Sequence, residues 1–177
     1  PSAAAAVSAA AANAAATDNN EEGADGYASS EISDLGDTDY AAAAYWDKRY
    51  ASYSPFDWLM EYDHFKANGL SSFIQPDDNI VMLGCGSAAF SADMYDDGFV
   101  NIKNIDLSSV VIQKMAAMHA KARPEMTWQV MDVQKLEFDD ETFDVAFDKS
   151  TMDCIFCCDK SNEMIAEMMK EAWRVLK

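Results

Sequence analysis

Two glycines and an aspartate have the types and the spacing that ligand chemistry needs. Gly84, Gly86 and Ala89 form a G-x-G-x-x-A turn directly after the apolar run Ile80–Leu83, and Asp106 lies 22 residues after the first glycine. Glycines let a turn tighten and let the backbone approach a ligand closely. An acid at the end of the next strand can accept hydrogen bonds from a ribose diol. The spacing predicts a site for an adenosine-containing ligand, and taken alone it also fits NAD.

Three further features distinguish between the candidate ligands. Asp132 follows another apolar run and can accept from an adenine amino group, with Val133 packed on the ring. The site is acidic and offers no evident group to neutralise a pyrophosphate. An aromatic-rich segment precedes the first strand, and aromatic faces attract desolvated cations such as sulfonium. Each feature alone is more typical of a turn or a core, but together they favour S-adenosylmethionine over NAD.

Length and charge bound the class of protein. The chain has 177 residues, half of them hydrophobic, which suffices for one domain with a real core. The net charge is −18, and no Lys or Arg precedes Lys48. So many carboxylates disfavour binding to nucleic acid or to an anionic membrane and favour a basic protein partner. No apolar run is long enough to span a membrane.

Four cysteines occur, at Cys85, Cys154, Cys157 and Cys158. No second cysteine pair or nearby histidine could complete a zinc site with them, so we predict no metal. Reduced, partly buried thiols are typical of a cytoplasmic protein, and we expect that compartment.

Composition divides the chain into three parts. Residues 1–40 are rich in Ala and then in acidic and small residues, and we predict a disordered tail. Residues 41–78 are rich in aromatics and predict a helical cap. Residues 79–177 alternate strand and helix patterns, with strands expected at Ile80–Leu83, Asn101–Ile105, Met126–Met131 and Phe143–Asp148. This alternation predicts an α/β, Rossmann-like parallel sheet with helices on both faces.

Two helices in the third part have predictable core faces. Ser108 is placed to be the N-cap of the first, with Val111, Met115 and Met118 on its buried face. The buried face of the last helix is predicted to comprise Ile165, Met168, Met169, Ala172 and Leu176.

The number of strands predicts an incomplete sheet. Doubly wound sheets continue beyond the fourth strand and its helix. We therefore expect a fragment that contains the N-terminal part of the domain and lacks the C-terminal half. Its Phe143–Asp148 strand would then form an exposed edge that is prone to association.

The motifs also carry a family resemblance, which covers about Tyr45 to Lys177. The segments "YWDKRY", "FDW", "LGCG", "MYDDGFVNIKNIDLSSVVIQKM", "DKSTMD" and "RVLK" follow one another as in a eukaryotic group of class I, or seven-strand, methyltransferases. The group resembles the lysine methyltransferases of translation elongation factor 1-alpha and the methyltransferase-like domain once linked to endothelin-converting enzyme. The resemblance implies S-adenosyl-L-methionine as cofactor and a protein substrate.

The resemblance also implies which residues bind the cofactor. Aromatics of the cap would close over it, the glycine turn and the acids would hold the nucleoside, and the lysine after the fourth strand would meet the methionyl carboxylate. The implied residues are Trp46, Tyr50, Trp58, Gly84, Gly86, Asp106, Leu107, Asp132, Val133 and Lys149. Asp153 is more typical of a helix start than of a catalytic base, and no general base is assigned.

Two departures from the family pattern stand out. The family's "GCGNS" is Gly-Cys-Gly-Ser-Ala here, which places Ser87 and Ala88 beside the turn. The family's "DKGTLD" is "DKSTMD", so Ser150 replaces a glycine and would be strained if that glycine had a positive φ.

The predicted function is S-adenosylmethionine-dependent methylation of a protein lysine, with an elongation factor as the favoured substrate. The alternative is a truncated or degenerate methyltransferase domain that acts as a non-catalytic interaction module. An NAD-binding oxidoreductase is the third interpretation.

Overall fold

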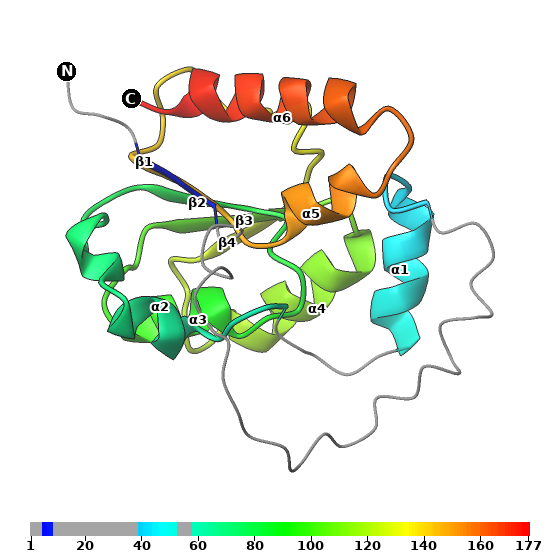
Figure 1. Ribbon diagram of the computed structural model, residues 1–177. Coiled ribbons are helices and arrows are strands. Elements are labelled where there is room, and N and C mark those ends of the chain that lie inside the picture. The colour runs from blue at the N-terminus through cyan, green and yellow to red at the C-terminus, as the bar shows by residue number, and fades with distance from the viewer. Residues whose placement is uncertain (1–4, 9–38, 53–57) are drawn as a thin grey trace, which may run out of the picture.

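The apolar runs expected to be strands pair into a parallel sheet. The computed structural model, shown in Figure 1, describes residues 5–8, 39–52 and 58–177. Its sheet has the strand order β1-β5-β2-β3-β4, and every pairing is parallel. The strands are β1 (Ala5–Ser8), β2 (Ile80–Leu83), β3 (Ile102–Asp106), β4 (Thr127–Val130) and β5 (Val145–Asp148).

Helices cover both faces of this sheet, as predicted. They are α1 (Ala43–Ser52), α2 (Tyr62–Ala67), the 3₁₀-helix η3 (Leu70–Ser72), α3 (Phe90–Asp96), α4 (Ser109–His119), α5 (Thr151–Phe156) and α6 (Ser161–Val175). Figure 1 shows α5 and α6 on one side of the sheet and α2, α3 and α4 on the other. The prediction of a Rossmann-like α/β fold with an N-terminal helical cap is confirmed.

Alternation along the strands builds a core on each face. Ile80 and Met82 point to one face, where they pack with Phe147 and with side chains of α2 and α3 such as Phe90. Val81 and Leu83 point to the other face and pack with apolar residues of α5 and α6, which include Ile155, Met168 and Ala172. The four residues of β2 are all buried, as expected for a central strand with both faces covered.

The predicted buried face of α4 is confirmed in part. Ser108 is its N-cap, and its side chain accepts a hydrogen bond from the Val111 amide at 3.3 Å. Val111 and Met115 are buried as predicted, but Met118 is 59% exposed, so its assignment to the core was wrong. His119 is buried in its place, because residue 119 stands one full turn after Met115 and shares its side of the helix.

The residues predicted to be buried on α6 need one correction of the same kind. Met168 and Ala172 are buried and Leu176 is buried just after the helix, but Met169 is 44% exposed. Met168, Ala172 and Val175 follow the i, i+4, i+7 spacing of one stripe, and Met169 lies about 100° around the helix from Met168. The predicted stripe was therefore too wide.

The N-terminal part of the chain contains a strand that the sequence did not predict. Ala5–Ser8 form β1, which pairs in parallel with β5 in the register Ala5 to Val145 and Ser8 to Asp148. These four residues of the predicted tail thus form a strand. The rest of residues 1–38 lies outside the described residues.

This pairing also changes the position of β5. The sequence predicted β5 at an exposed edge, but it lies between β1 and β2. Phe143, Val145 and Phe147 are buried as that pattern required. The edge prediction was therefore wrong for the structure as described.

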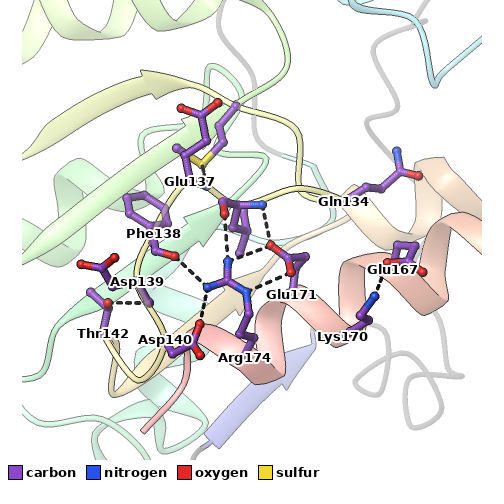
Figure 2. Close-up of polar contacts among 12 residues, drawn as sticks. Gln134, Glu137, Phe138, Asp139, Asp140, Thr142, Glu167, Lys170, Glu171 and Arg174 are labelled. Carbon is purple, nitrogen blue, oxygen red and sulfur yellow. Dashed lines mark hydrogen bonds and ion pairs between the residues drawn. The ribbon is translucent and has the colours of Figure 1, made fainter.

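The connection from β4 to β5 is fastened to α6 by one arginine, as Figure 2 shows. Arg174 donates from Nη1 and Nη2 to the carbonyl oxygens of Phe138 and Leu136, both at 2.8 Å. It also pairs with Glu171 and Asp140, at 2.8 and 2.7 Å. Glu171 in turn accepts from the Leu136 amide at 2.8 Å. The planar fork of donors suits arginine to several acceptors at once.

Candidate functional site

The carboxyl ends of the strands bring the predicted site residues to one edge of the sheet. Gly84 follows β2 directly, Asp106 ends β3, and Lys149 follows β5 directly, while Asp132 comes two residues after β4. Ligands of open α/β sheets bind at this edge. The ten residues predicted to bind the cofactor all line a single pocket there.

The glycine turn requires glycine for steric as well as conformational reasons. Gly84 has φ +71° and Gly86 has φ +57°, a region that other residues rarely adopt. A Cβ on Gly84 would lie 2.0 Å from Thr151 Oγ1, and one on Gly86 would lie 3.0 Å from the Tyr50 hydroxyl oxygen. The turn is thus packed between α5 and the aromatic cap.

Asp106 supports this turn from below and is itself part of the pocket. Its Oδ2 accepts from the Gly86 amide and its Oδ1 from the Ser108 amide, both at 2.9 Å. Burial raises the pKa of Asp106 to about 6, because desolvation of the carboxylate outweighs these two hydrogen bonds. The group is therefore mainly ionised at neutral pH. Each carboxylate oxygen can accept more than one hydrogen bond, so the group can also accept from hydroxyls of a ligand.

The aromatic cap is held over the pocket by helix α1. Trp46 and Tyr50 stack with ring centroids 5.7 Å apart, and the Trp46 indole donates to the Tyr40 carbonyl oxygen at 2.8 Å. Tyr50 is buried, and desolvation raises the pKa of its phenol. The Lys114 ammonium of α4 donates to the Tyr50 carbonyl oxygen. These contacts place two aromatic faces at the pocket.

Asp47 of α1 anchors this helix to the start of α4. Its Oδ1 accepts from the Ser108 hydroxyl at 2.6 Å and from the Val110 amide at 3.1 Å. The hydrogen bonds lower the pKa of Asp47, and the Ser108 hydroxyl contributes most. Asp47 thus satisfies an amide of the first turn of α4 from another helix. No local sequence pattern indicates this contact, because the two segments lie about 60 residues apart.

Lys149, which directly follows β5, holds the cap segment around Trp58 against the sheet. Its ammonium donates to the Trp58 carbonyl oxygen at 2.8 Å and lies 5.6 Å from the centre of the Phe90 ring. The Arg49 guanidinium lies 5.2 Å from the centre of the Trp58 ring. Lys149 therefore lines the pocket as a cation whose position is fixed by a backbone oxygen and an aromatic face.

The end of the pocket near β4 is formed by Leu107, Asp132 and Val133. Asp132 Oδ1 accepts from the amide and the side-chain amide of Gln134, at 2.9 and 3.3 Å. Val133 is buried and Leu107 is partly buried. A carboxylate beside two aliphatic side chains suits a flat, apolar ring that carries a hydrogen-bond donor.

The structure adds lining residues that the sequence did not single out as site residues. Thr151 Oγ1 donates to the Leu83 carbonyl oxygen at 2.7 Å and locks α5 against the glycine turn. Asp148, which does not itself line the pocket, accepts from the amides of Thr151 and Met152 and so caps α5. Burial raises the pKa of Asp148 to about 6. Further lining residues include Tyr40, Met131, Cys154 and Met164.

Among the described residues, no group of three His, Cys, Asp or Glu side chains could hold a metal ion. The four cysteines have free thiols. None of the described helices has the length and apolar character that a membrane span requires.

Comparison with known proteins identifies the family of this chain. The family profile "Methyltransferase domain" matches residues 80–177. The chain is 36% identical over 143 residues to the eEF1A lysine and N-terminal methyltransferase homolog of Drosophila melanogaster, with 78% of this chain and 21% of that protein covered. It is 36% identical over 119 residues to EEF1A lysine methyltransferase 4 of Mus musculus, with coverages of 66% and 46%. This chain therefore spans a fifth to a half of the length of these relatives.

A solved structure supports the fold. The crystal structure of the PH0226 protein from Pyrococcus horikoshii aligns with a TM-score of 0.54 and 28% identity, over 73% of this chain and 61% of that one. The fold and the family profile identify a methyltransferase domain of class I, a class whose cofactor is S-adenosylmethionine. The chain belongs to the methyltransferase-domain family, which confirms the resemblance and places the glycine turn in a methyltransferase rather than in an NAD-dependent oxidoreductase.

Proposed function

We propose that this protein transfers a methyl group from S-adenosylmethionine to a lysine ε-amine of a protein, with translation elongation factor 1A as the favoured substrate. The observation that carries the proposal is the meeting of the glycine turn, Asp106 and the aromatic cap in one pocket of a methyltransferase-family chain. The names of the relatives support elongation factor 1A as the substrate.

The nucleoside would lie at the ends of β2, β3 and β4. Asp106 would accept from the ribose hydroxyls, since its two oxygens face Gly86 and Ser108 at the turn. Asp132 would accept from the adenine amino group, with Leu107 and Val133 against the ring. A hydrogen bond to a charged acceptor contributes about 1.5–3 kcal/mol, so Asp106 alone would account for a tenfold or larger part of the affinity.

The remaining pocket groups suit the methionyl part and its positive sulfur. Lys149 is a cation that can meet a carboxylate, and its ammonium already lies at the pocket. The stacked rings of Trp46 and Tyr50 offer faces that stabilise a desolvated cation and exclude water. Trp58 extends this apolar cover on the side of Lys149.

The chain would promote the reaction by positioning. Bound S-adenosylmethionine supplies a methyl group on a positively charged sulfur. The lysine nitrogen must arrive unprotonated, because its lone pair forms the new N–C bond while the C–S electron pair stays on sulfur. A dry pocket that holds both partners in line accelerates such a transfer. Asp153 is exposed in the first turn of α5 and does not line the pocket, so no base is assigned.

A labelling experiment tests the proposal. The purified chain is incubated with S-adenosylmethionine that carries a radioactive methyl group and with purified elongation factor 1A, and the product is hydrolysed to amino acids. We expect label in methylated lysine, and none when the lysines of the substrate have been acetylated beforehand. Label on the N-terminal amine alone would contradict lysine as the acceptor. Cofactor binding without any transfer would support the non-catalytic alternative.

We also propose the cytoplasm as the compartment. Translation elongation takes place there, and the free thiols of the four cysteines are compatible with a reducing environment. Fractionation of cells that express a tagged chain would test this, and recovery in a membrane or organelle fraction would contradict it.

A further inference from the structure

Ser150 has an unusual backbone conformation for a buried residue. It has φ +76° and is 6% exposed. The other non-glycine residues of the described chain with positive φ, which are Leu59, Glu141 and Lys160, are all exposed. A left-handed backbone costs free energy for any residue with a Cβ.

Bonds on both sides impose this conformation. The preceding residue, Lys149, donates to the Trp58 carbonyl oxygen at 2.8 Å. The following residue, Thr151, donates to the Leu83 carbonyl oxygen at 2.7 Å, and its amide donates to Asp148. Strained backbone persists where its surroundings determine it in this way, and it is concentrated at functional sites.

The hydroxyl of Ser150 is a second anomaly at the same place. Its Oγ is buried and has no hydrogen-bond partner among the described residues, and Ser150 lines the pocket. A buried hydroxyl that lacks a partner is destabilising, and almost all such groups in proteins are satisfied. Strain and an unsatisfied hydroxyl thus coincide at one pocket residue, and a bound ligand would satisfy the hydroxyl.

The strand order indicates which part of the ligand reaches Ser150. Along the sheet edge the order is β5, β2, β3 and β4. Asp106 at the end of β3 and Asp132 after β4 suit the ribose and the adenine, so the nucleoside occupies that side of the glycine turn. Ser150 stands after β5, on the other side of Gly84. The part of the cofactor that extends past Gly84 toward β5 is the amino-acid arm attached to the sulfur.

We propose that the Ser150 hydroxyl forms a hydrogen bond with the zwitterionic amino-acid arm of S-adenosylmethionine and serves as an additional cofactor-binding residue. This inference rests on the proposed function and deepens it. A serine hydroxyl can both donate and accept, so it can serve the carboxylate or the ammonium of the arm. Its satisfaction on binding would offset the cost of keeping serine where glycine fits better.

Two ligands distinguish the contribution of the amino-acid arm to affinity from that of the nucleoside. S-adenosylhomocysteine has the arm, and 5′-methylthioadenosine has the same adenine, ribose and thioether sulfur without it. Their affinities are measured by calorimetry for the full chain and for Ser150→Ala and Ser150→Gly. The matched control is Thr127→Val, because Thr127 Oγ1 is also buried, has no partner within the part of the chain that the structure describes, and lies outside the pocket.

We expect both Ser150 variants to bind S-adenosylhomocysteine at least tenfold more weakly, or about 1.4 kcal/mol, and 5′-methylthioadenosine within twofold of the parent chain. Thr127→Val should change neither affinity. Without ligand, Ser150→Gly should melt at the same or a higher temperature than the parent, because glycine relieves the strain. This readout separates a lost contact from a damaged fold and covers the case in which Ser150→Ala does not fold.

Three outcomes would count against the inference. Unchanged affinity of Ser150→Gly for S-adenosylhomocysteine would overturn it. Equal weakening of both ligands would also overturn it, since the hydroxyl would then not be at the arm. If the parent chain bound neither ligand, the proposed function itself would fail, and this inference with it.

Discussion

Gly84→Ala should be among the most damaging single-methyl changes in this protein. The substitution places a Cβ at φ +71°, where a left-handed residue costs about 1–2 kcal/mol. The same Cβ would lie 2.0 Å from Thr151 Oγ1 and 3.0 Å from Thr151 Cβ. Rotating Thr151 away would break its bond to the Leu83 carbonyl oxygen and would leave its own Cβ in place. Overpacking of this kind costs roughly 1–3 kcal/mol.

The two costs together lower the free energy of unfolding by about 2–5 kcal/mol, which is a large part of the roughly 5–15 kcal/mol that a domain has. Gly69→Ala is the matched control, because Gly69 has φ +90° but its added Cβ would meet nothing closer than 3.7 Å. Urea unfolding followed by circular dichroism gives both values. A Gly84→Ala loss no larger than that of Gly69→Ala would refute the packing argument and leave only backbone strain.

Three further changes have defined outcomes. Asp47→Ala should lower stability by about 1 kcal/mol, because α4 loses the hydrogen bonds that its Val110 amide and the Ser108 hydroxyl donate to Asp47. It should also weaken binding of S-adenosylhomocysteine, measured by calorimetry, because α1 is no longer held against α4. Burial raises the pKa of Asp106 from 3.8 to about 6, so the folded state holds this proton more tightly than the unfolded state does. The resulting stability, about 3 kcal/mol, is fully present below pH 3.8 and is lost as the pH rises through 6. Cofactor affinity should fall below pH 6, where the carboxylate becomes protonated, and Asp106→Asn should remove both pH dependences. Arg174→Lys should lower the melting temperature, because one ammonium cannot replace a guanidinium that bonds Glu171, Asp140 and two carbonyl oxygens. Lys170→Met is the control: it breaks only an exposed ion pair with Glu167 and should leave the melting temperature unchanged.

Local patterns predicted the parts of the fold that depend on neighbouring residues. The strand Ile80–Leu83 and the N-cap at Ser108 were predicted correctly, because an apolar run and a capping side chain act over a few residues. The helical faces were predicted less well. Met118 and Met169 are apolar yet exposed, and methionine adapts to both environments, so composition could not show where each stripe ends.

The candidate site was predictable because the fold gathers residues that share one position relative to their strands. Asp106 and Lys149 stand at or directly after strand ends, and this alone brings them to one edge of the sheet. Contacts between distant segments were not predictable. Asp47 meets Ser108, and Thr151 meets Leu83, through helix placement that no local pattern encodes. The pairing of β1 with β5 also joins segments that lie about 140 residues apart.

The central claim, that this pocket binds S-adenosylmethionine through its ribose, is tested most directly by calorimetric titration of the full chain and of Asp106→Ala. We predict that the parent binds S-adenosylmethionine and S-adenosylhomocysteine at one site, and that Asp106→Ala weakens both at least tenfold, since both contain the ribose. Asp159→Ala, which changes an exposed acid outside the pocket, should bind like the parent. Absence of binding to the parent, or tighter binding of NAD than of S-adenosylmethionine, would contradict the account.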